Sequence, residues 1–177
     1  ISYSIFSMHE RFRYKTSEDL IRKASELGFV LPFSDDVTPL LENVKLGEST
    51  IPNRLVVQPM EGYDSDNEGA PSELTERRYL RYSAGASGVI WFEAVSVNHD
   101  GRSNPRQLWL NNKSSDKFAY LNEKIRKNSG INGGTPFLVI QLTHSGRYSK
   151  PEGKPAPRVA ALNPLLVRTT PVVLSDD

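Results

Sequence analysis

Three apolar runs in this sequence end in residues that can hold or position a ligand. α/β folds place their sites where strands end in acidic, glycine-containing loops. A carboxamide at such a strand end offers one hydrogen-bond acceptor and two donors. The candidate residues at or just after the ends of the runs are Pro59, Met60, Glu61 and Gly62, then Glu93 and Ala94, and finally Gln141.

The runs themselves predict strands of a parallel sheet. Residues 55–57 are continuously apolar, a pattern typical of a strand covered on both faces, and residues 88–94 and 136–142 have the same shape. Pro59 lacks a backbone donor, so the first strand should end there, and Gly62 frees the chain to turn. Before this strand, residues 41–51 predict a small hairpin that turns near Gly47.

Helices are predicted on either side of the second strand. Ser72 or Thr75 can cap a helix that Gly85 closes, and Ser115 can cap another that ends at Gly130.

A further helix is predicted near the start of the chain. It begins at Thr16 or Ser17 and ends at Gly28. We assign it to an N-terminal extension, residues 1–39, and expect it to pack on the outside of the domain.

The alternation of strands and helices predicts an α/β fold. Long connections after the strands and short ones before them are typical of a (β/α)8 TIM barrel. A doubly wound sheet is the competitor, but the glycine-rich phosphate-binding turns that it usually carries do not occur here. A whole barrel takes about 250 residues. We therefore expect residues 40–177 to supply about the first three β/α units of a truncated barrel, with Ser175 near the start of a further helix.

Composition excludes several classes of protein. The 177 residues carry 22 Lys and Arg against 21 Asp and Glu, so the net charge of +1 gives no reason to expect nucleic acid or an anionic membrane as partner. The absence of cysteine excludes disulfides and thiolate chemistry within these residues. No apolar run approaches the roughly 20 residues of a membrane helix, and the first residues are too short and polar a stretch for a signal peptide. These features indicate a soluble, cytoplasmic protein.

Metal binding is not favoured either. The loop from Asp64 begins like a calcium loop, with oxygen ligands at alternate positions and Gly69 at the sixth, but Thr75 replaces the bidentate glutamate at the twelfth. A solvated turn is the preferred interpretation. The 3 histidines are isolated from one another, so we expect no metal site.

Taken together, the strand ends resemble the Old Yellow Enzyme or NADH:flavin oxidoreductase family. The block Gln141-Leu142-Thr143-His144-Ser145-Gly146-Arg147 is the most specific piece, and the match covers about residues 40–177. The other pieces, in the same order as in the family, are Leu46-Gly47, Asn53-Arg54-Leu55-Val56, Pro59-Met60, Arg78-Tyr79, Gly88-Val89-Ile90, Glu93-Ala94, Gly101-Arg102 and Leu174-Ser175-Asp176-Asp177.

The resemblance implies a binding site for FMN at these strand ends. Pro59 and Met60 match positions whose backbone lies against the flavin, and Ala94 matches a small residue that lets the ring approach closely. Gln141 matches a glutamine whose carboxamide bonds the pyrimidine edge of the ring; the alternative is a polar residue that merely ends a strand.

Four further residues receive more limited predictions. Glu61 departs from the family, which has a small Thr or Cys donor there, and a carboxylate would disfavour the negative charge of reduced flavin unless it is protonated or points away. We hypothesise that Glu61 lowers the flavin potential or faces substrate. Tyr63 lies near an active-site tyrosine of relatives and is a candidate substrate contact. His144 and Arg147 are interpreted first as loop-ordering residues and second as ligand contacts.

The function implied by the resemblance is FMN-dependent oxidoreduction. NADH or NADPH would pass hydride through the flavin to an electron-poor double bond or related acceptor, a small-molecule substrate. The catalytic acid and the phosphate-binding loops of the family would lie beyond residue 177, so this chain alone is expected to be inactive. Two alternatives stay open: a non-catalytic half-barrel module that needs a partner, and a barrel enzyme for a sugar or phosphate. A homo-oligomer is also left open.

Overall fold

The N-terminal part of the chain forms a unit of its own. The computed structural model describes residues 11–130, 134–163 and 169–175, and its contacts divide the chain into two compact units, Ile1–Val37 and Thr38–Asp177. The first unit contains helix α1, Ser17–Glu26, whose N-cap Thr16 accepts a hydrogen bond from the Asp19 backbone N–H at 3.1 Å. The predicted helix is therefore confirmed, whereas its packing on the outside of the domain stays a prediction.

The second unit begins with a short helix and a hairpin. Helix α2 spans Thr38–Leu41, and strands β1, Val44–Leu46, and β2, Ser49–Ile51, pair antiparallel. Gly47 turns the hairpin with φ of 57°, a left-handed conformation that glycine adopts without a steric penalty. The predicted hairpin and its turn are confirmed.

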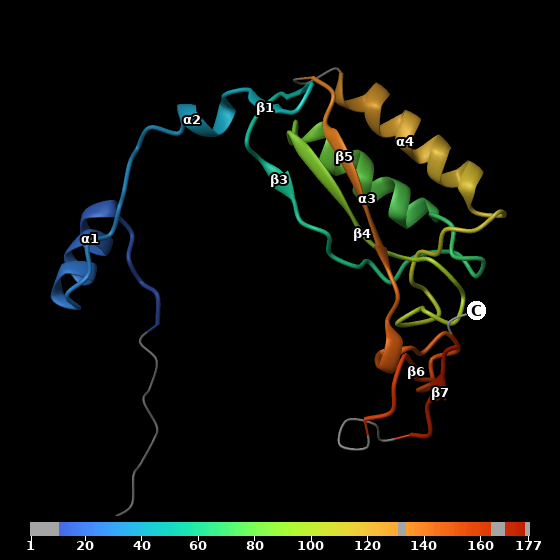
Figure 1. The fold of residues 1–177 in the computed structure, drawn as a ribbon. Coiled ribbons are helices and arrows are strands. Elements are labelled where there is room, and N and C mark those ends of the chain that lie inside the picture. Colours follow the sequence, from blue (N-terminus) through green and yellow to red (C-terminus); the bar gives the residue numbers. More distant parts are fainter. Residues whose placement is uncertain (1–10, 131–133, 164–168, 176–177) are drawn as a thin grey trace, which may run out of the picture. The chain divides into compact units, whose positions relative to one another are not determined.

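A 3-stranded parallel sheet follows, in the order β3-β4-β5. Its strands are β3, Val56–Val57, β4, Val89–Ser96, and β5, Phe137–Thr143, and they alternate with the helices α3, Glu73–Ala84, and α4, Ser115–Ser129. Figure 1 shows α3 and α4 beside one another along this sheet. The predicted strand-helix alternation is confirmed from β3 to β5, while β5 is followed by a 3-10 helix, η1, at Gly146–Tyr148.

The N-cap residues of α3 and α4 act differently. Ser72 and Thr75 form a reciprocal capping box at the start of α3, and Gly85 ends that helix. At α4 the prediction was displaced by one residue, because Ser114 is the N-cap and Ser115 is the first helical residue. The Ser114 hydroxyl donates to the Trp109 carbonyl at 2.7 Å, so this cap secures the preceding loop rather than the helix N-terminus.

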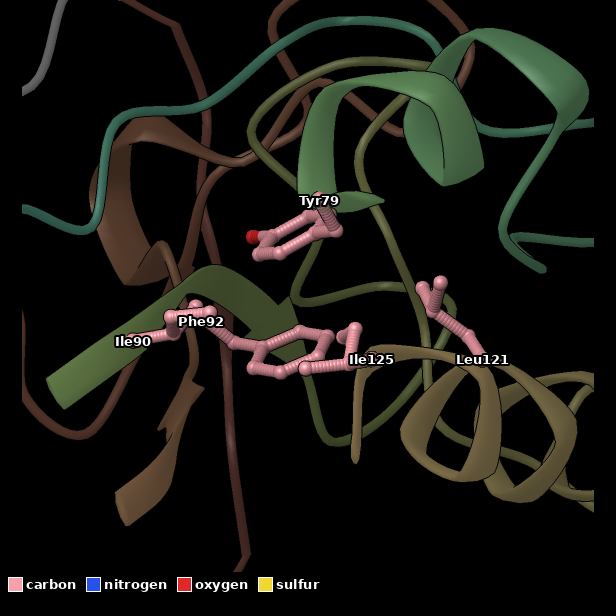
Figure 2. Packing of buried hydrophobic residues seen from close by; sticks show 5 residues of the cluster. All are labelled: Tyr79, Ile90, Phe92, Leu121 and Ile125. Carbon is pink, nitrogen blue, oxygen red and sulfur yellow. The ribbon is translucent and has the colours of Figure 1, made fainter. Parts of the chain in front are cut away.

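The core lies between the sheet and the two helices. Figure 2 shows Tyr79 from α3 above Phe92 from β4, with Leu121 and Ile125 from α4 beside them. The Tyr79 and Phe92 rings stack with centroids 4.2 Å apart. Ile90 completes this cluster and is fully buried.

The opposite face of the sheet is largely open among the described residues. Val57 packs against the core, so the two-residue alternation directs Val56 to the other face, where it is 44% exposed. Trp91 is 40% exposed between the buried Ile90 and Phe92. The prediction that the first strand is covered on both faces is thus wrong for this chain, because α3 and α4 cover one face only.

The proline-rich C-terminal part contains a feature that its sequence did not predict. Strand β6, Arg158–Val159, pairs parallel with β7, Val172–Val173, in a separate 2-stranded sheet. The start of a helix expected near Ser175 involves Asp176 and Asp177, which lie outside the described residues. Within the described ranges, none of the helices combines the length and apolar character that crossing a membrane requires.

Candidate functional site

The parallel register brings Ala94 and Gln141 side by side. These two residues are direct partners across β4 and β5, after a bulge in β4 between Trp91 and Ala94. Leu138 packs on the core, so alternation along β5 places Gln141 on the face away from the helices. A small side chain and a carboxamide therefore share the open face of the sheet at its carboxyl edge.

The Gln141 side chain is available for a ligand. It is partly buried, yet its carboxamide makes no hydrogen bond to any residue that the structure describes. Because no described residue occupies this carboxamide, its one acceptor and two donors can pair with a ligand edge that offers both N–H and C=O groups.

Pro59 and Met60 follow the end of β3, as predicted. The strand ends at Val57, and the Met60 backbone N–H donates to the Gln58 carbonyl at 2.9 Å, which turns the chain. The Met60 side chain is 71% exposed. The three strands thus deliver Met60, Ala94 and Gln141 to the same edge of the sheet, since parallel strands share one carboxyl edge.

Glu61 is directed into the loop that follows β4. Its carboxylate accepts hydrogen bonds from the Ser103 hydroxyl at 3.2 Å, the Asn104 amide at 3.3 Å and the Gln107 amide at 3.3 Å. Burial raises the pKa of the Glu61 carboxyl above its usual value and the nearby Glu93 charge raises it further, against the opposing effect of the hydrogen bonds. Glu61 therefore binds the neighbouring loop, and its carboxylate is engaged with protein donors on both oxygens.

A buried ion-pair network of Arg78, Glu93 and Asp64 lies close to Glu61, and it was not predicted as part of the site. Glu93 is 2% exposed and its carboxylate pairs with the Arg78 guanidinium at 2.8 Å. The same carboxylate accepts from the Tyr79 hydroxyl at 3.2 Å and from the Gly62 backbone N–H at 2.8 Å. Arg78 also pairs with Asp64 at 2.8 Å. This network fixes the loop after β3 to helix α3 and to strand β4.

The charges of this network stabilise one another. Burial disfavours the charge on Arg78, but the Glu93 and Asp64 carboxylates outweigh it and raise the pKa of the guanidinium. Burial and the Glu93 charge raise the pKa of the Tyr79 hydroxyl, which stays protonated and can donate to Glu93. An acidic residue inside the apolar run 89–95 was the sequence signal for this network, because a buried carboxylate requires partners.

The bulge in β4 explains how Glu93 reaches α3. Phe92 and Glu93 both contact Tyr79, one by ring stacking and the other by hydrogen bonds. In a regular strand two consecutive side chains would point to opposite faces. The bulge therefore turns Glu93 toward the helix and leaves Ala94 opposite Gln141.

Tyr63 protrudes from this anchored loop. Its φ of 54° is unusual for a residue other than glycine, and its side chain is 61% exposed. The residues on either side are held in place, Gly62 by Glu93 and Asp64 by Arg78. Such a conformation persists only where neighbouring contacts enforce it.

The remaining loop residues have structural contacts. The His144 Nδ1 accepts from the Gly146 backbone N–H at 3.0 Å, which agrees with a loop-ordering role, while Arg147 is exposed on η1. In the loop that begins like a calcium site, each acidic side chain pairs with a cation: Asp64 with Arg78, Asp66 with Lys117 and Glu68 with Lys113. Among the residues described, the structure contains no cluster of His, Cys, Asp or Glu suited to a metal ion.

Comparison with known proteins establishes the family. A model of the NADH:flavin oxidoreductase / NADH oxidase family matches residues 39–170. The chain belongs to this family, which confirms the resemblance inferred from its motifs.

Individual relatives agree with this assignment. The chain is similar to the NADPH dehydrogenase of Clostridium acetobutylicum, with 29% identity over 127 residues that cover 70% of this chain and 36% of that protein. It is 33% identical over 108 residues to the NADPH dehydrogenase of Bacillus pumilus, covering 59% of this chain and 30% of that protein. The chain thus spans about a third of the length of these relatives.

Solved structures support the α/β fold. The Old Yellow Enzyme homologue from Zymomonas mobilis matches with a TM-score of 0.59 and 17% identity, over 70% of this chain and 33% of that one. Morphinone reductase matches with a TM-score of 0.55 and 20% identity, over 71% of this chain and 32% of that one.

Proposed function

We propose that this chain supplies the amino-terminal part of an FMN-binding (β/α)8 barrel in an NAD(P)H-dependent oxidoreductase. The observation that carries the proposal is the pairing of Ala94 with Gln141 on the open face of the sheet, where the Gln141 carboxamide has no partner among the described residues. Residues 1–39 are an N-terminal extension of this barrel, and residues 40–177 are the barrel part.

The residues at the strand ends fit a flavin. The ring of FMN is flat and its pyrimidine edge carries both N–H and C=O groups, which a carboxamide complements. Gln141 would hold that edge, Ala94 would leave room for the ring, and the backbone at Pro59 and Met60 would lie against it. Tyr63, exposed on its anchored loop, is the proposed substrate contact.

The cofactor supplies the redox chemistry. Bound FMN would accept a hydride from NADH or NADPH and pass it to an electron-poor double bond or a related acceptor. The curated relatives are named NADPH dehydrogenases, which favours NADPH as the donor. The residues of this chain would bind the cofactor and orient it toward the substrate.

The unpaired surfaces of the sheet support a larger barrel. Between β5 and α4, a groove of about 290 Å³ is lined by the apolar side chains of Phe92, Phe118 and Leu138 and also by the polar side chains of Asn122 and Arg126. In a barrel, a further helix would cover such a groove. On the open face, Val56 and Trp91 are partly exposed and would be covered by the inward-facing side chains of further strands.

The visible absorption spectrum of the complete protein that carries this chain tests the proposal. A flavin band, with FMN released on denaturation and identified by mass, is expected. A folded, colourless protein that also fails to bind added FMN would refute it and favour a non-catalytic module.

A matched pair of variants tests the assigned contact. Gln141→Leu keeps the side-chain size but removes the carboxamide, and at about 1 kcal/mol for each hydrogen bond lost FMN should bind roughly tenfold to a hundredfold more weakly. Asn67→Leu removes an exposed carboxamide from the loop after β3 and should leave the affinity unchanged. Equal affinities for the two variants would remove Gln141 from the site.

A further inference from the structure

Gln107 occupies a central place at the strand ends that no sequence motif singles out. It lies on the loop after β4 and is 2% exposed. Its amide nitrogen is 3.3 Å from a Glu61 carboxylate oxygen, 3.1 Å from the Ala94 carbonyl and 3.4 Å from the Thr143 hydroxyl. Glu61 follows β3, Ala94 lies two residues before the end of β4, and Thr143 is the last residue of β5.

The carboxamide of Gln107 is fully used by these contacts. An amide nitrogen carries two N–H donors, so three acceptors share two hydrogens. The Gln107 side-chain oxygen accepts from the Ser103 backbone N–H at 2.6 Å, which fixes the side chain to its own loop. Its backbone carbonyl also accepts from the Ser65 hydroxyl at 3.3 Å.

The loop around Gln107 continues the sheet at its carboxyl edge. The Ser96 backbone N–H donates to the Leu108 carbonyl at 2.8 Å, and the Val97 N–H donates to the Thr143 carbonyl at 3.1 Å. The Gln107 side chain therefore lies where the end of β4, the end of β5 and the loop after β3 meet.

We propose that Gln107 is a positioning residue that holds the three strand ends at the spacing required by the cofactor. Its bond to the Ala94 carbonyl fixes Ala94, and Ala94 is the direct strand partner of Gln141. This inference rests on the proposed function as far as the ligand is FMN.

The same contacts account for Glu61. Its carboxylate serves as the acceptor for Gln107, Asn104 and Ser103. Glu61 and Gln107 thus act as a pair, and the role of Glu61 is to bind the loop rather than to contact substrate.

The test compares Gln107→Met with Ser103→Ala in the complete protein. Methionine keeps the length and volume of glutamine and removes the hydrogen bonds. Ser103→Ala removes the bond to Glu61 and the bond accepted from the Asn104 amide, neither of which involves β4 or β5. Without flavin, Gln107→Met should exchange the Ser96 and Val97 amide hydrogens about tenfold faster, because local opening at the strand ends becomes easier. Ser103→Ala should leave both rates unchanged.

The second readout is the flavin. In Gln107→Met, FMN should bind about tenfold more weakly and its visible band should shift, under conditions where the protein is fully folded. Unchanged amide exchange would overturn the positioning role whatever the flavin does. Faster exchange with unchanged FMN affinity and spectrum would reduce Gln107 to a purely structural residue.

Two further results keep the outcomes distinct. If Gln107→Met does not fold, Thr143→Val removes one of the three acceptors with little change of shape, and the Val97 amide should exchange two- to threefold faster; no change there would overturn the inference. If the unsubstituted protein binds no FMN, the proposed function and the ligand in this inference both fail, while amide exchange still decides whether Gln107 holds the strand ends.

Discussion

Tyr79 gives the most direct test of how the site is anchored to the fold. Its ring stacks on Phe92 in the core, while its hydroxyl donates to the Glu93 carboxylate at 3.2 Å and accepts from the Glu93 backbone N–H at 2.9 Å. Tyr79→Phe keeps the ring and deletes both hydrogen bonds. Since Glu93 is 2% exposed, water cannot replace the lost partner without opening the core.

The expected loss of stability follows from these two bonds. A buried neutral hydrogen bond contributes about 0.5–1.5 kcal/mol and one to a charged group about 1.5–3 kcal/mol. Arg78 and the Gly62 N–H still satisfy the Glu93 carboxylate, so the lower part of the summed range applies. We expect the free energy of unfolding to fall by about 2–3 kcal/mol.

Urea unfolding of the complete protein measures this change, with Tyr82→Phe as the control. Tyr82 lies on the same helix, and its hydroxyl makes no hydrogen bond within the described residues, so its substitution should cost less than about 0.5 kcal/mol. With a slope of about 2 kcal/mol per M, the Tyr79→Phe midpoint should fall by roughly 1–1.5 M. Equal effects of the two substitutions, or a loss below about 0.5 kcal/mol for Tyr79→Phe, would refute the role of this hydroxyl.

Two further predictions concern the loop after β3. The pKa of the Glu61 carboxyl is raised in the folded state, so the folded protein binds this proton more tightly than the unfolded chain does. Protonated Glu61 therefore stabilises the fold at low pH. This stabilisation is lost as the pH rises from the pKa of Glu61 in the unfolded chain through its pKa in the folded protein. Glu61→Gln should therefore gain stability relative to the unsubstituted protein as the pH rises above the ordinary glutamate pKa of about 4.3; unfolding titrations with parallel pH profiles would contradict this. A Cβ on Gly62 would overlap the Arg78 guanidinium, so Gly62→Ala should displace Arg78 from Glu93. Because the Arg78 side chain is partly exposed, we expect the free energy of unfolding to fall by only about 1–3 kcal/mol. Gly130→Ala, at an open helix end, is the thermal-unfolding control, and similar losses for both would disprove the steric argument.

Local sequence patterns predicted most of the elements. The capping residues Thr16 and Ser72 and the turn at Gly47 act on groups a few residues away, so their effects can be read from neighbouring positions. Apolar runs identified the three parallel strands because burial of such runs dominates their free energy of folding. The short apolar strand β3 was predicted, but the sequence of the strand did not reveal that one of its faces is exposed. Whether a face is exposed depends on which other elements pack against it.

The site was predicted less completely because its contacts join distant residues. The family resemblance predicted Ala94 and Gln141 as cofactor contacts, and the register of β4 and β5 places these two residues side by side. Glu61 was recognised as unusual, but its partners Ser103, Asn104 and Gln107 lie more than 40 positions away in the chain.

The sequence by itself determined the parallel strands, the helix caps at Thr16 and Ser72 and the family of the chain, since each of these depends on short-range patterns or on motifs in order. Tertiary structure alone decided that the β4 bulge turns Glu93 toward Arg78 and Tyr79, and that Gln107 joins three strand ends. A buried polar side chain requires hydrogen-bond partners, and the tertiary packing decides which residues lie close enough to provide them. These residues are distant in the chain, so a single sequence does not reveal them.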